Sequence, residues 1–166
     1  MARILIVERV PFMRNVTRFA LEYGGHTIIQ EAEDGQEAVD FYKKCKPDLV
    51  ILELMLQKIT GMQVLETIKG IDPDARVIIC STVRQQRMID LAMDHCADSY
   101  IVKPFQIPNF LREVNRVLGI EEIPEKEGDE ALIPLEKEDL EKIAAKVLTK
   151  TISPEEMRSF LRELNR

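Results

Sequence analysis

Four residues of types that take part in chemistry each follow directly on a short apolar run of the sequence. Runs of four or five apolar residues are too short for a helix of ordinary length and suit strands buried on both faces. In an open parallel sheet, ligands and reactive groups gather at the edge where the strands end. We therefore expect the side chains of the four residues, two carboxylates, one hydroxyl and one ammonium group, to lie together on that rim of the sheet. Loops are polar in most proteins, so residue type alone also allows the simpler explanation that these four are ordinary loop residues. The four residues are Glu8, Glu53, Ser81 and Lys103.

The apolar runs alternate with stretches whose apolar residues recur at helical spacing. Pro11 suits the first turn of a helix, Gly61 opens another helix, and Gly119 closes the last one. Five strands alternating with five helices predict an α/β fold, a doubly wound parallel sheet built from right-handed βαβ units. The predicted strands are Ile4–Val7, Thr27–Ala32, Leu49–Leu52, Val77–Cys80 and Ser99–Val102.

Composition narrows the classes of function. The net charge of −6 argues against a nucleic-acid surface, and two histidines leave little for a zinc site. Three cysteines cannot all pair, and we read them as reduced thiols of a cytoplasmic protein. No basic-then-apolar signal segment opens the chain, and no apolar run approaches the ~18 residues of a membrane span.

Four segments carry a resemblance to a known family. The segments ILIVER, DLVILELMLQKITG, ICST and YIVKPF, in this order and spacing, resemble the receiver domain of response regulators, the CheY-like family. The acid at 53, the hydroxyl 28 positions later and the lysine 22 positions after that make the combination specific. The resemblance covers residues 1–119 and implies a flavodoxin-like sheet of strand order 2-1-3-4-5.

The resemblance also implies a function. In this family a phosphohistidine partner donates its phosphoryl group to an aspartate after the third strand, and acidic residues after the first strand help to hold Mg²⁺. Carried onto this chain, Lys103 is the lysine and Ser81 the hydroxyl that contact the phosphoryl group. Thr82 competes for the hydroxyl role, but the spacing favours Ser81. Tyr100 is the aromatic switch of the fifth strand.

This chain departs from the family at the chemical positions. Glu53 stands where the family has the phosphorylated aspartate, and Gln57 stands where the family usually has a proline. Of the two acids that follow the first strand in the family, the first is Glu8 here and the second is replaced by Arg9. Glu8 and Glu53 give −2 while Arg9 and Lys103 give +2, so the pocket sums to zero. A guanidinium at a ligand position repels Mg²⁺, and the longer side chain of Glu53 displaces its oxygens from in-line positions. We therefore predict a pseudo-receiver without a metal or other cofactor and without enzymatic activity.

Two states of this pocket are compatible with the sequence. In one, Glu53 reaches Lys103 or Ser81 and imitates a phosphorylated aspartate, which gives an active-like form. In the other, Arg9 clamps Glu53 and holds an inactive-like form. A buried carboxylate needs a charged partner, so one of these contacts is expected.

The composition changes after Gly119. Residues 120–130 read as an acidic linker, and residues 131–166 as a helical extension, most simply a hairpin of two amphipathic helices. Residues 120–166 hold 13 acids and 8 bases, net −5, which argues against a DNA-binding output domain. We expect the hairpin to dock on another protein molecule, most simply the second subunit of a homodimer. Docking on its own receiver domain is the alternative.

The sequence thus predicts an atypical response regulator that signals by protein–protein contact. The contacts would involve the face of the fourth helix, fifth strand and fifth helix, or the C-terminal helices. The first alternative is a phosphorylation-competent regulator of a two-component phosphorelay. The second is a DNA-binding transcriptional regulator that acts through the extension.

Overall fold

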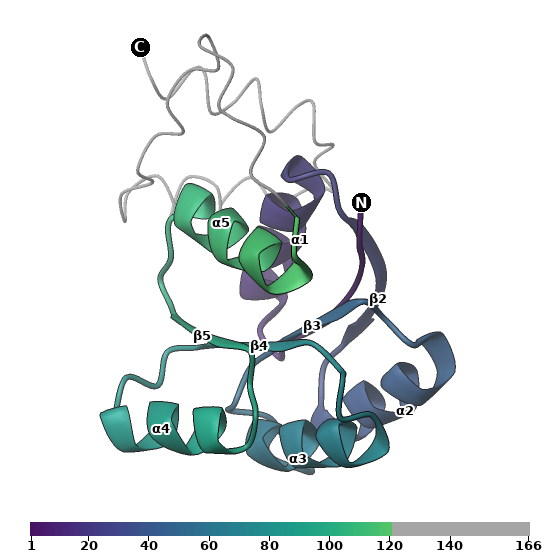
Figure 1. Cartoon of the computed structure of the whole chain (residues 1–166), viewed down its shortest axis with the longest axis vertical. Coiled ribbons are helices and arrows are strands. Elements are labelled where there is room, and N and C mark those ends of the chain that lie inside the picture. The colour runs from purple at the N-terminus through teal and green to yellow at the C-terminus, as the bar shows by residue number, and fades with distance from the viewer. Residues whose placement is uncertain (121–166) are drawn as a thin grey trace, which may run out of the picture.

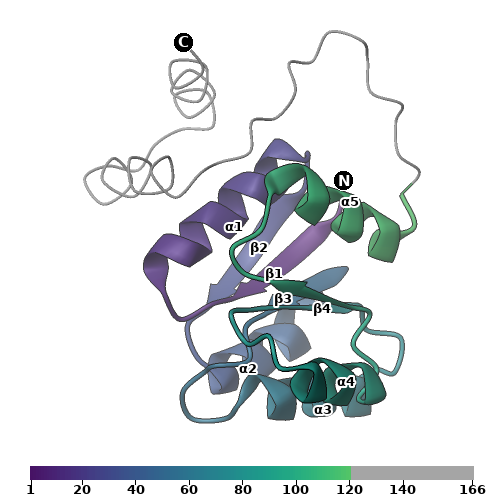
Figure 2. The ribbon, with the colours of Figure 1, turned by 90° about the vertical axis from the view of Figure 1, so that its left-hand side faces the viewer.

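The central strand of the sheet, β3 (Leu49–Leu52), is buried along its whole length and lies between two layers of helices. The computed structural model describes residues 1–120 of the chain. Helices α1 and α5 cover one face of the sheet, and α2, α3 and α4 cover the other (Figures 1 and 2). The other elements are β1 (Arg3–Val7), α1 (Pro11–Tyr23), β2 (Thr27–Ala32), α2 (Gly35–Cys45), α3 (Gly61–Ile71), β4 (Val77–Ser81), α4 (Gln86–Asp94), β5 (Ser99–Val102) and α5 (Ile107–Leu118).

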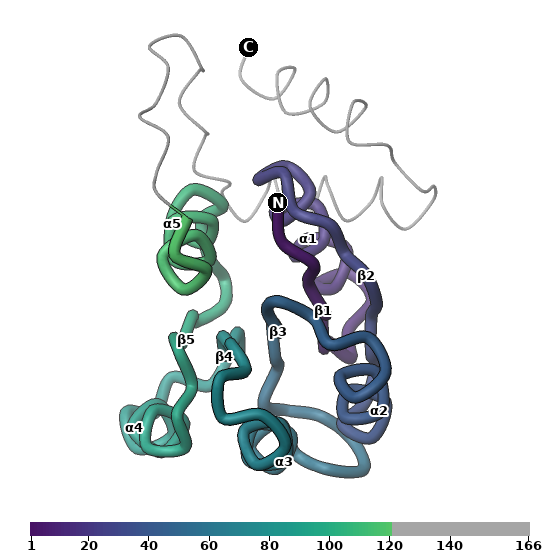
Figure 3. The backbone as a smooth tube through the Cα atoms, turned by 45° about the vertical axis from the view of Figure 1, so that its right-hand side comes forward, coloured from purple at the N-terminus to yellow at the C-terminus, as the bar shows by residue number. Residues whose placement is uncertain are grey.

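The strands are all parallel and lie in the order β2-β1-β3-β4-β5, which confirms the predicted order and fold class for residues 1–120. Because all five strands are parallel and a helix joins each to the next, every strand ends at the same edge of the sheet. Figure 3 shows the two groups of helices, α1 with α5 and α2 with α3 and α4, from a third direction. In the register, Val7 pairs with Leu52, and Ser81 pairs with Val102. Glu8 and Glu53, which follow β1 and β3, are therefore neighbours. Ser81, which ends β4, is likewise a neighbour of Lys103, which follows β5.

Alternate side chains of each central strand enter opposite cores. In β1, Leu5 and Val7 join the core under α2, α3 and α4, whereas Ile4 and Ile6 join the core under α1 and α5. All four side chains are at most 1% exposed. Full burial of a large aliphatic side chain stabilises a fold by roughly 1.5–3 kcal/mol, so the two cores hold the strands in this register.

Caps fix where the helices begin beside the rim. The Asp34 carboxylate accepts hydrogen bonds from the Gln36 and Glu37 amides at the start of α2. Thr60 and Gln63 form a reciprocal capping box at the start of α3. At the other end of the domain, Gly119 closes α5 in the left-handed conformation at φ 68°. The loops of the rim therefore have anchored ends.

The predicted extension lies almost wholly outside the described residues. Of the acidic linker 120–130 only Ile120 is described, and the helical extension 131–166 lies outside the description. Within residues 1–120, no helix is long and apolar enough to cross a membrane.

Two glycines of α3 give a matched test of how tightly the loop after β3 packs. A Cβ at Gly61 would lie 2.2 Å from the Glu53 carbonyl oxygen, whereas a Cβ at Gly70 would meet nothing within 4 Å. We expect Gly61→Ala to lower the free energy of unfolding by about 2 kcal/mol or more, because backbone must shift. Gly70→Ala should raise it by about 0.5–1 kcal/mol, because alanine favours a helix interior. Urea denaturation measures both, and equal effects would contradict the close approach at Gly61.

Candidate functional site

The four side chains predicted to share a rim meet in one buried cluster at the carboxyl edge of the sheet. Glu8 and Glu53 are each 5% exposed, Lys103 is 4% exposed, and Ser81 is fully buried. They come from the ends of β1, β3, β5 and β4, so the strand register brings them together. The prediction that the four residues share one rim is confirmed, and their functional roles stay predictions.

Lys103 lies between the two glutamates. Its Nζ atom is 2.6 Å from Glu53 Oε2 and also contacts Glu8 Oε2. Burial by itself lowers the pKa of Lys103, but the two carboxylates outweigh it and raise that pKa above its ordinary value. The ammonium group thus stays charged and links the ends of β1 and β3. We call Glu8, Glu53 and Lys103 the lysine cluster.

Glu53 uses its second carboxylate oxygen as well. Ser81 Oγ donates a hydrogen bond of 2.5 Å to Glu53 Oε1, and the Met55 amide donates one of 3.0 Å to the same atom. Burial by itself raises the pKa of Glu53, but the contacts with Lys103, Ser81 and the Met55 amide lower it below its ordinary value. Glu53 is therefore an ionised carboxylate with both oxygens engaged.

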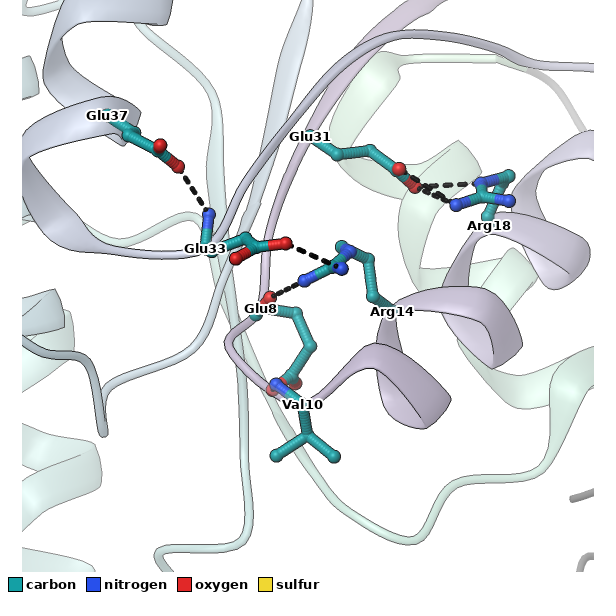
Figure 4. A network of polar contacts seen from close by, with 7 residues as sticks. All are labelled: Glu8, Val10, Arg14, Arg18, Glu31, Glu33 and Glu37. Atoms are coloured by element: carbon teal, nitrogen blue, oxygen red, sulfur yellow. Dashed lines mark hydrogen bonds and ion pairs between the residues drawn. The ribbon is translucent and has the colours of Figure 1, made fainter. Parts of the chain in front are cut away.

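Glu8 is held in the same way. Its Oε1 accepts a hydrogen bond of 3.0 Å from the Val10 amide, two residues ahead, as Glu53 accepts one from Met55. Arg14 Nη1 donates to the Glu8 carbonyl at 2.9 Å, and Arg14 Nη2 pairs with Glu33 at 3.0 Å (Figure 4). The loop after β1 is thus fixed from both α1 and the end of β2.

Arg9 does not clamp Glu53. Arg9 is exposed, and within residues 1–120 the partners of Glu53 are Lys103, Ser81 and the Met55 amide. Of the two states that the sequence left open, the contacts are those of the state in which Glu53 reaches Lys103 and Ser81.

Ser81 rather than Thr82 reaches the cluster, since Thr82 is exposed. Tyr100, the predicted switch, is half-buried, and its hydroxyl donates a hydrogen bond of 2.7 Å to the Val83 carbonyl. Burial, followed by the charge of Glu53, raises the pKa of Tyr100. The hydroxyl is therefore a neutral donor that ties β5 to the loop between β4 and α4.

These residues do not fit a magnesium ion. Mg²⁺ needs near-octahedral oxygen ligands, usually carboxylates with waters and phosphates. Here the Lys103 ammonium contacts both carboxylates that would serve, and Glu53 has no oxygen without a donor. Within residues 1–120, no group of three or more His, Cys, Asp or Glu side chains is placed to hold a metal ion. The cation of this pocket is a lysine.

Sequence reasoning missed the backbone partners of the site. The amides of Val10 and Met55 and the Val83 carbonyl were not predicted to take part. Residue type gave no signal for these amides, because the side chains that commonly accept from an amide two residues ahead are those of Asp, Asn, Ser and Thr. No residue pattern identifies the Val83 carbonyl.

The lysine cluster makes a prediction about stability. Lys103→Met should lower the free energy of unfolding at pH 7.5 by about 3–5 kcal/mol, because it leaves two buried carboxylates without a cation. Lys58→Met removes an exposed ion pair with Asp34, where the Lys58 side chain is 62% exposed, and should change stability little. Denaturant unfolding of both variants measures the difference.

The sign of the pH dependence should also reverse. In the native protein the pKa of Glu53 is lowered, so its contribution is present above its ordinary pKa of 4.5 and is lost as the pH falls below it. In Lys103→Met, burial should raise the pKa of Glu53 instead, so that variant should gain stability as the pH falls from neutral toward the ordinary pKa of 4.5. A loss over that range in the variant would contradict the assignment of Lys103 as the partner.

The sequence of the described domain matches a known family and its relatives. The profile of the response regulator receiver domain matches residues 4–115. The protein CcdB of Bacillus subtilis is 41% identical over 119 residues, which cover 72% of this chain and 99% of CcdB. The chemotaxis protein CheY of the same organism is 40% identical over 117 residues, which cover 70% of this chain and 98% of CheY.

Solved structures agree with the profile. A chain of the CheX–CheY–BeF₃–Mg²⁺ complex from Borrelia burgdorferi matches with a TM-score of 0.68 at 31% identity, covering 69% of this chain and 87% of that one. The response regulator TrrA from Thermotoga maritima, in complex with Mg²⁺ and BeF, matches with a TM-score of 0.65 at 32% identity, covering 70% and 99%. The chain therefore belongs to the response regulator receiver domain family and is CheY-like.

Proposed function

We propose that this receiver is a pseudo-receiver, which signals by protein–protein contact without Mg²⁺-dependent phosphorylation and without enzymatic activity of its own. The observation that carries the proposal is the Lys103 ammonium between the Glu8 and Glu53 carboxylates. In a phosphorylated receiver, a metal ion offsets the charge of the phosphoryl oxygens. Here the Lys103 ammonium already offsets one of the two negative charges on which such an ion would depend, and the exposed Arg9 takes the place of a further acid of the family.

The state of Glu53 supports the same proposal. Phosphoryl transfer to a carboxylate needs one oxygen free to attack in line. One oxygen of Glu53 contacts Lys103, and the other accepts from Ser81 and the Met55 amide. Attack by either oxygen would weaken a buried, charge-assisted contact, because bonding to phosphorus withdraws negative charge from that oxygen. The pocket therefore stabilises the carboxylate as it is.

The contacts of Glu53 support the further proposal that this receiver is held in an active-like form. In the family, the lysine after the fifth strand and the hydroxyl after the fourth contact the phosphoryl group, and the aromatic of the fifth strand turns inward. Here Glu53 itself contacts Lys103 and Ser81, and half-buried Tyr100 bonds to the Val83 carbonyl. The charge of Glu53 takes the place of the phosphoryl charge.

The signalling surface in this proposal is the face of α4, β5 and α5. Ala92 is the buried residue of α4, whereas Leu91 is 38% exposed and Met93 is 45% exposed. Met88 and Ile89 are half-buried. An exposed surface rich in methionine adapts readily to an apolar partner. The partner proposed for this face is a signalling protein, as CheX is for CheY in the Borrelia complex.

The second candidate is a phosphorylation-competent response regulator of a two-component phosphorelay. The likeness to CheY at 40% identity favours it, as does the match to TrrA in complex with Mg²⁺ and BeF. In this candidate, Lys103 would have to leave Glu8 so that a metal ion could bind. The two candidates therefore differ in whether the chain takes up a phosphoryl group.

The decisive experiment is phosphorylation with a small donor. We expect no added phosphoryl mass when the full chain is incubated with Mg²⁺ and acetyl phosphate and examined by intact mass spectrometry. A Bacillus subtilis CheY sample treated in parallel tests the reagents. A Mg²⁺-dependent adduct that is absent from Glu53→Gln would establish the second candidate instead.

A designed rescue tests why the pocket is inert. Arg9→Asp combined with Glu53→Asp should restore Mg²⁺ binding, because the pair adds a carboxylate at a ligand position and shortens the other. Neither substitution alone should restore it fully. Calorimetric titration with Mg²⁺ measures binding, and Arg84→Asp with Glu53→Asp is the matched control, since Arg84 is another exposed arginine near Lys103. Equal Mg²⁺ binding by both double variants, or binding by neither, would contradict the explanation that Arg9 and the length of Glu53 prevent metal binding.

A further inference from the structure

Helix α1 carries a second apolar stripe beside the one that packs on the sheet. Thr17, Ala20 and Leu21 are its buried residues. Phe12, Val16 and Phe19 recur at helical spacing on another flank and are only half-buried. Phe19 packs partly against the core, whereas Phe12 and Val16 belong to neither core of the described domain. This flank is apolar without being needed for the sheet.

The flank is turned away from β2. Arg14 pairs with Glu33 just after β2, and Arg18 forms two hydrogen bonds of 2.7 and 2.8 Å with Glu31 in β2 (Figure 4). At 3.6 residues per turn, Val16 lies roughly opposite Arg14 and Arg18 around the helix. The stripe therefore faces the side on which α5 lies.

Helix α5 presents a matching flank. Glu113 accepts a hydrogen bond of 2.8 Å from Ser99 of β5, so the opposite side of α5 faces α1. On that side, a Cβ at Gly24 would lie 2.6 Å from Leu111, and Asn115 contacts His26 at 3.2 Å. Leu111 and Leu118 are half-buried there, and like Phe19 they pack partly against the core under α1 and α5.

These two flanks form one surface. Helices α1 and α5 lie side by side on the same face of the sheet in two perpendicular views (Figures 1 and 2). We call the surface formed by Phe12, Val16, Phe19, Leu111 and Leu118 the α1–α5 face.

The position where α5 ends indicates what covers this face. The chain leaves α5 through Gly119 and Ile120, which is 37% exposed, and 46 residues follow, 121–166. Their sequence contains apolar residues at helical spacing, among them Met157, Phe160 and Leu164. A segment tethered about ten residues away is present at an effective concentration in the millimolar range, which favours an intramolecular contact over a second copy in dilute solution.

We propose that the α1–α5 face binds the chain's own residues 131–166. This inference is independent of the pocket chemistry and holds whether or not Glu53 is phosphorylated. It favours the alternative in which the extension docks on its own receiver domain over docking on a second subunit. The flank of α5 that carries Glu113, beside β5, is not part of the α1–α5 face, so a signalling partner can bind the face of α4, β5 and α5 at the same time.

Hydrogen exchange on the full chain tests the proposal. Phe160→Asp places a charge on the apolar stripe of the segment and leaves residues 1–120 unchanged, and Ser159→Asp adds the same charge one position away. Amides of α1 should exchange about tenfold faster in Phe160→Asp than in the native chain and remain as in the native chain in Ser159→Asp. Val16→Asp should speed exchange in residues 131–166 to a similar degree.

Dilution identifies the source of the bound segment. Protection that is the same at 1 µM and 100 µM, with a monomer mass by light scattering, is the expected result. Protection that grows with concentration together with a dimer mass would overturn the proposal in favour of a second copy. Exchange in α1 that neither Phe160→Asp nor Val16→Asp changes would overturn it altogether. Far-ultraviolet circular dichroism confirms that each variant is folded.

Discussion

The site depends on one buried ammonium group held by two buried carboxylates. Lys103 contacts Glu8 and Glu53 at the edge of the sheet where β1, β3 and β5 end, and all three residues are at most 5% exposed. Moving such ions out of water costs several kcal/mol each, and their attraction offsets this cost only if the remaining hydrogen-bonding positions are satisfied. Within the described residues no buried side-chain nitrogen or oxygen lacks a partner. The cluster therefore demands an exact strand register, and the two apolar cores supply it.

The length of the acidic side chains decides what the pocket can hold. Each glutamate turns one oxygen back to the amide two residues ahead and still reaches Lys103 with the other. An aspartate is one methylene shorter, so it would reach less far toward the lysine. Glutamates at both positions thus suit a closed, lysine-centred pocket, whereas an open acidic pocket suits a hydrated metal ion. Arg9 is consistent with this, because an exposed cation next to Glu8 lies where a further metal ligand is expected in the family.

Much of the fold was predictable because short apolar runs and turn residues determine it locally. The five predicted strands match the structure to within one residue at each end, and Asp34 caps α2 as its type and position indicate. The meeting of Glu8, Glu53, Ser81 and Lys103 follows from parallel strands alone. The choice between Arg9 and Lys103 as the partner of Glu53 did not follow, because both are cations near the same rim. Side-chain direction decides it: Lys103 is buried, whereas Arg9 points to solvent.

The sheet separates two surfaces that differ in how they connect to the pocket. On one side, Ser81 contacts Glu53 and Tyr100 bonds to Val83, so the loop that leads into α4 is tied to the charge of the pocket. Helix α4 buries Ala92 and carries the exposed side chains of Leu91 and Met93. On the other side, α1 is fixed to β2 through the ion pairs of Arg14 and Arg18, and Arg14 also donates a hydrogen bond to the Glu8 carbonyl beside the lysine cluster. The pocket is thus tied to the loop before α4 through Ser81 and to α1 through Glu8, because the ends of the strands lie between the two layers of helices.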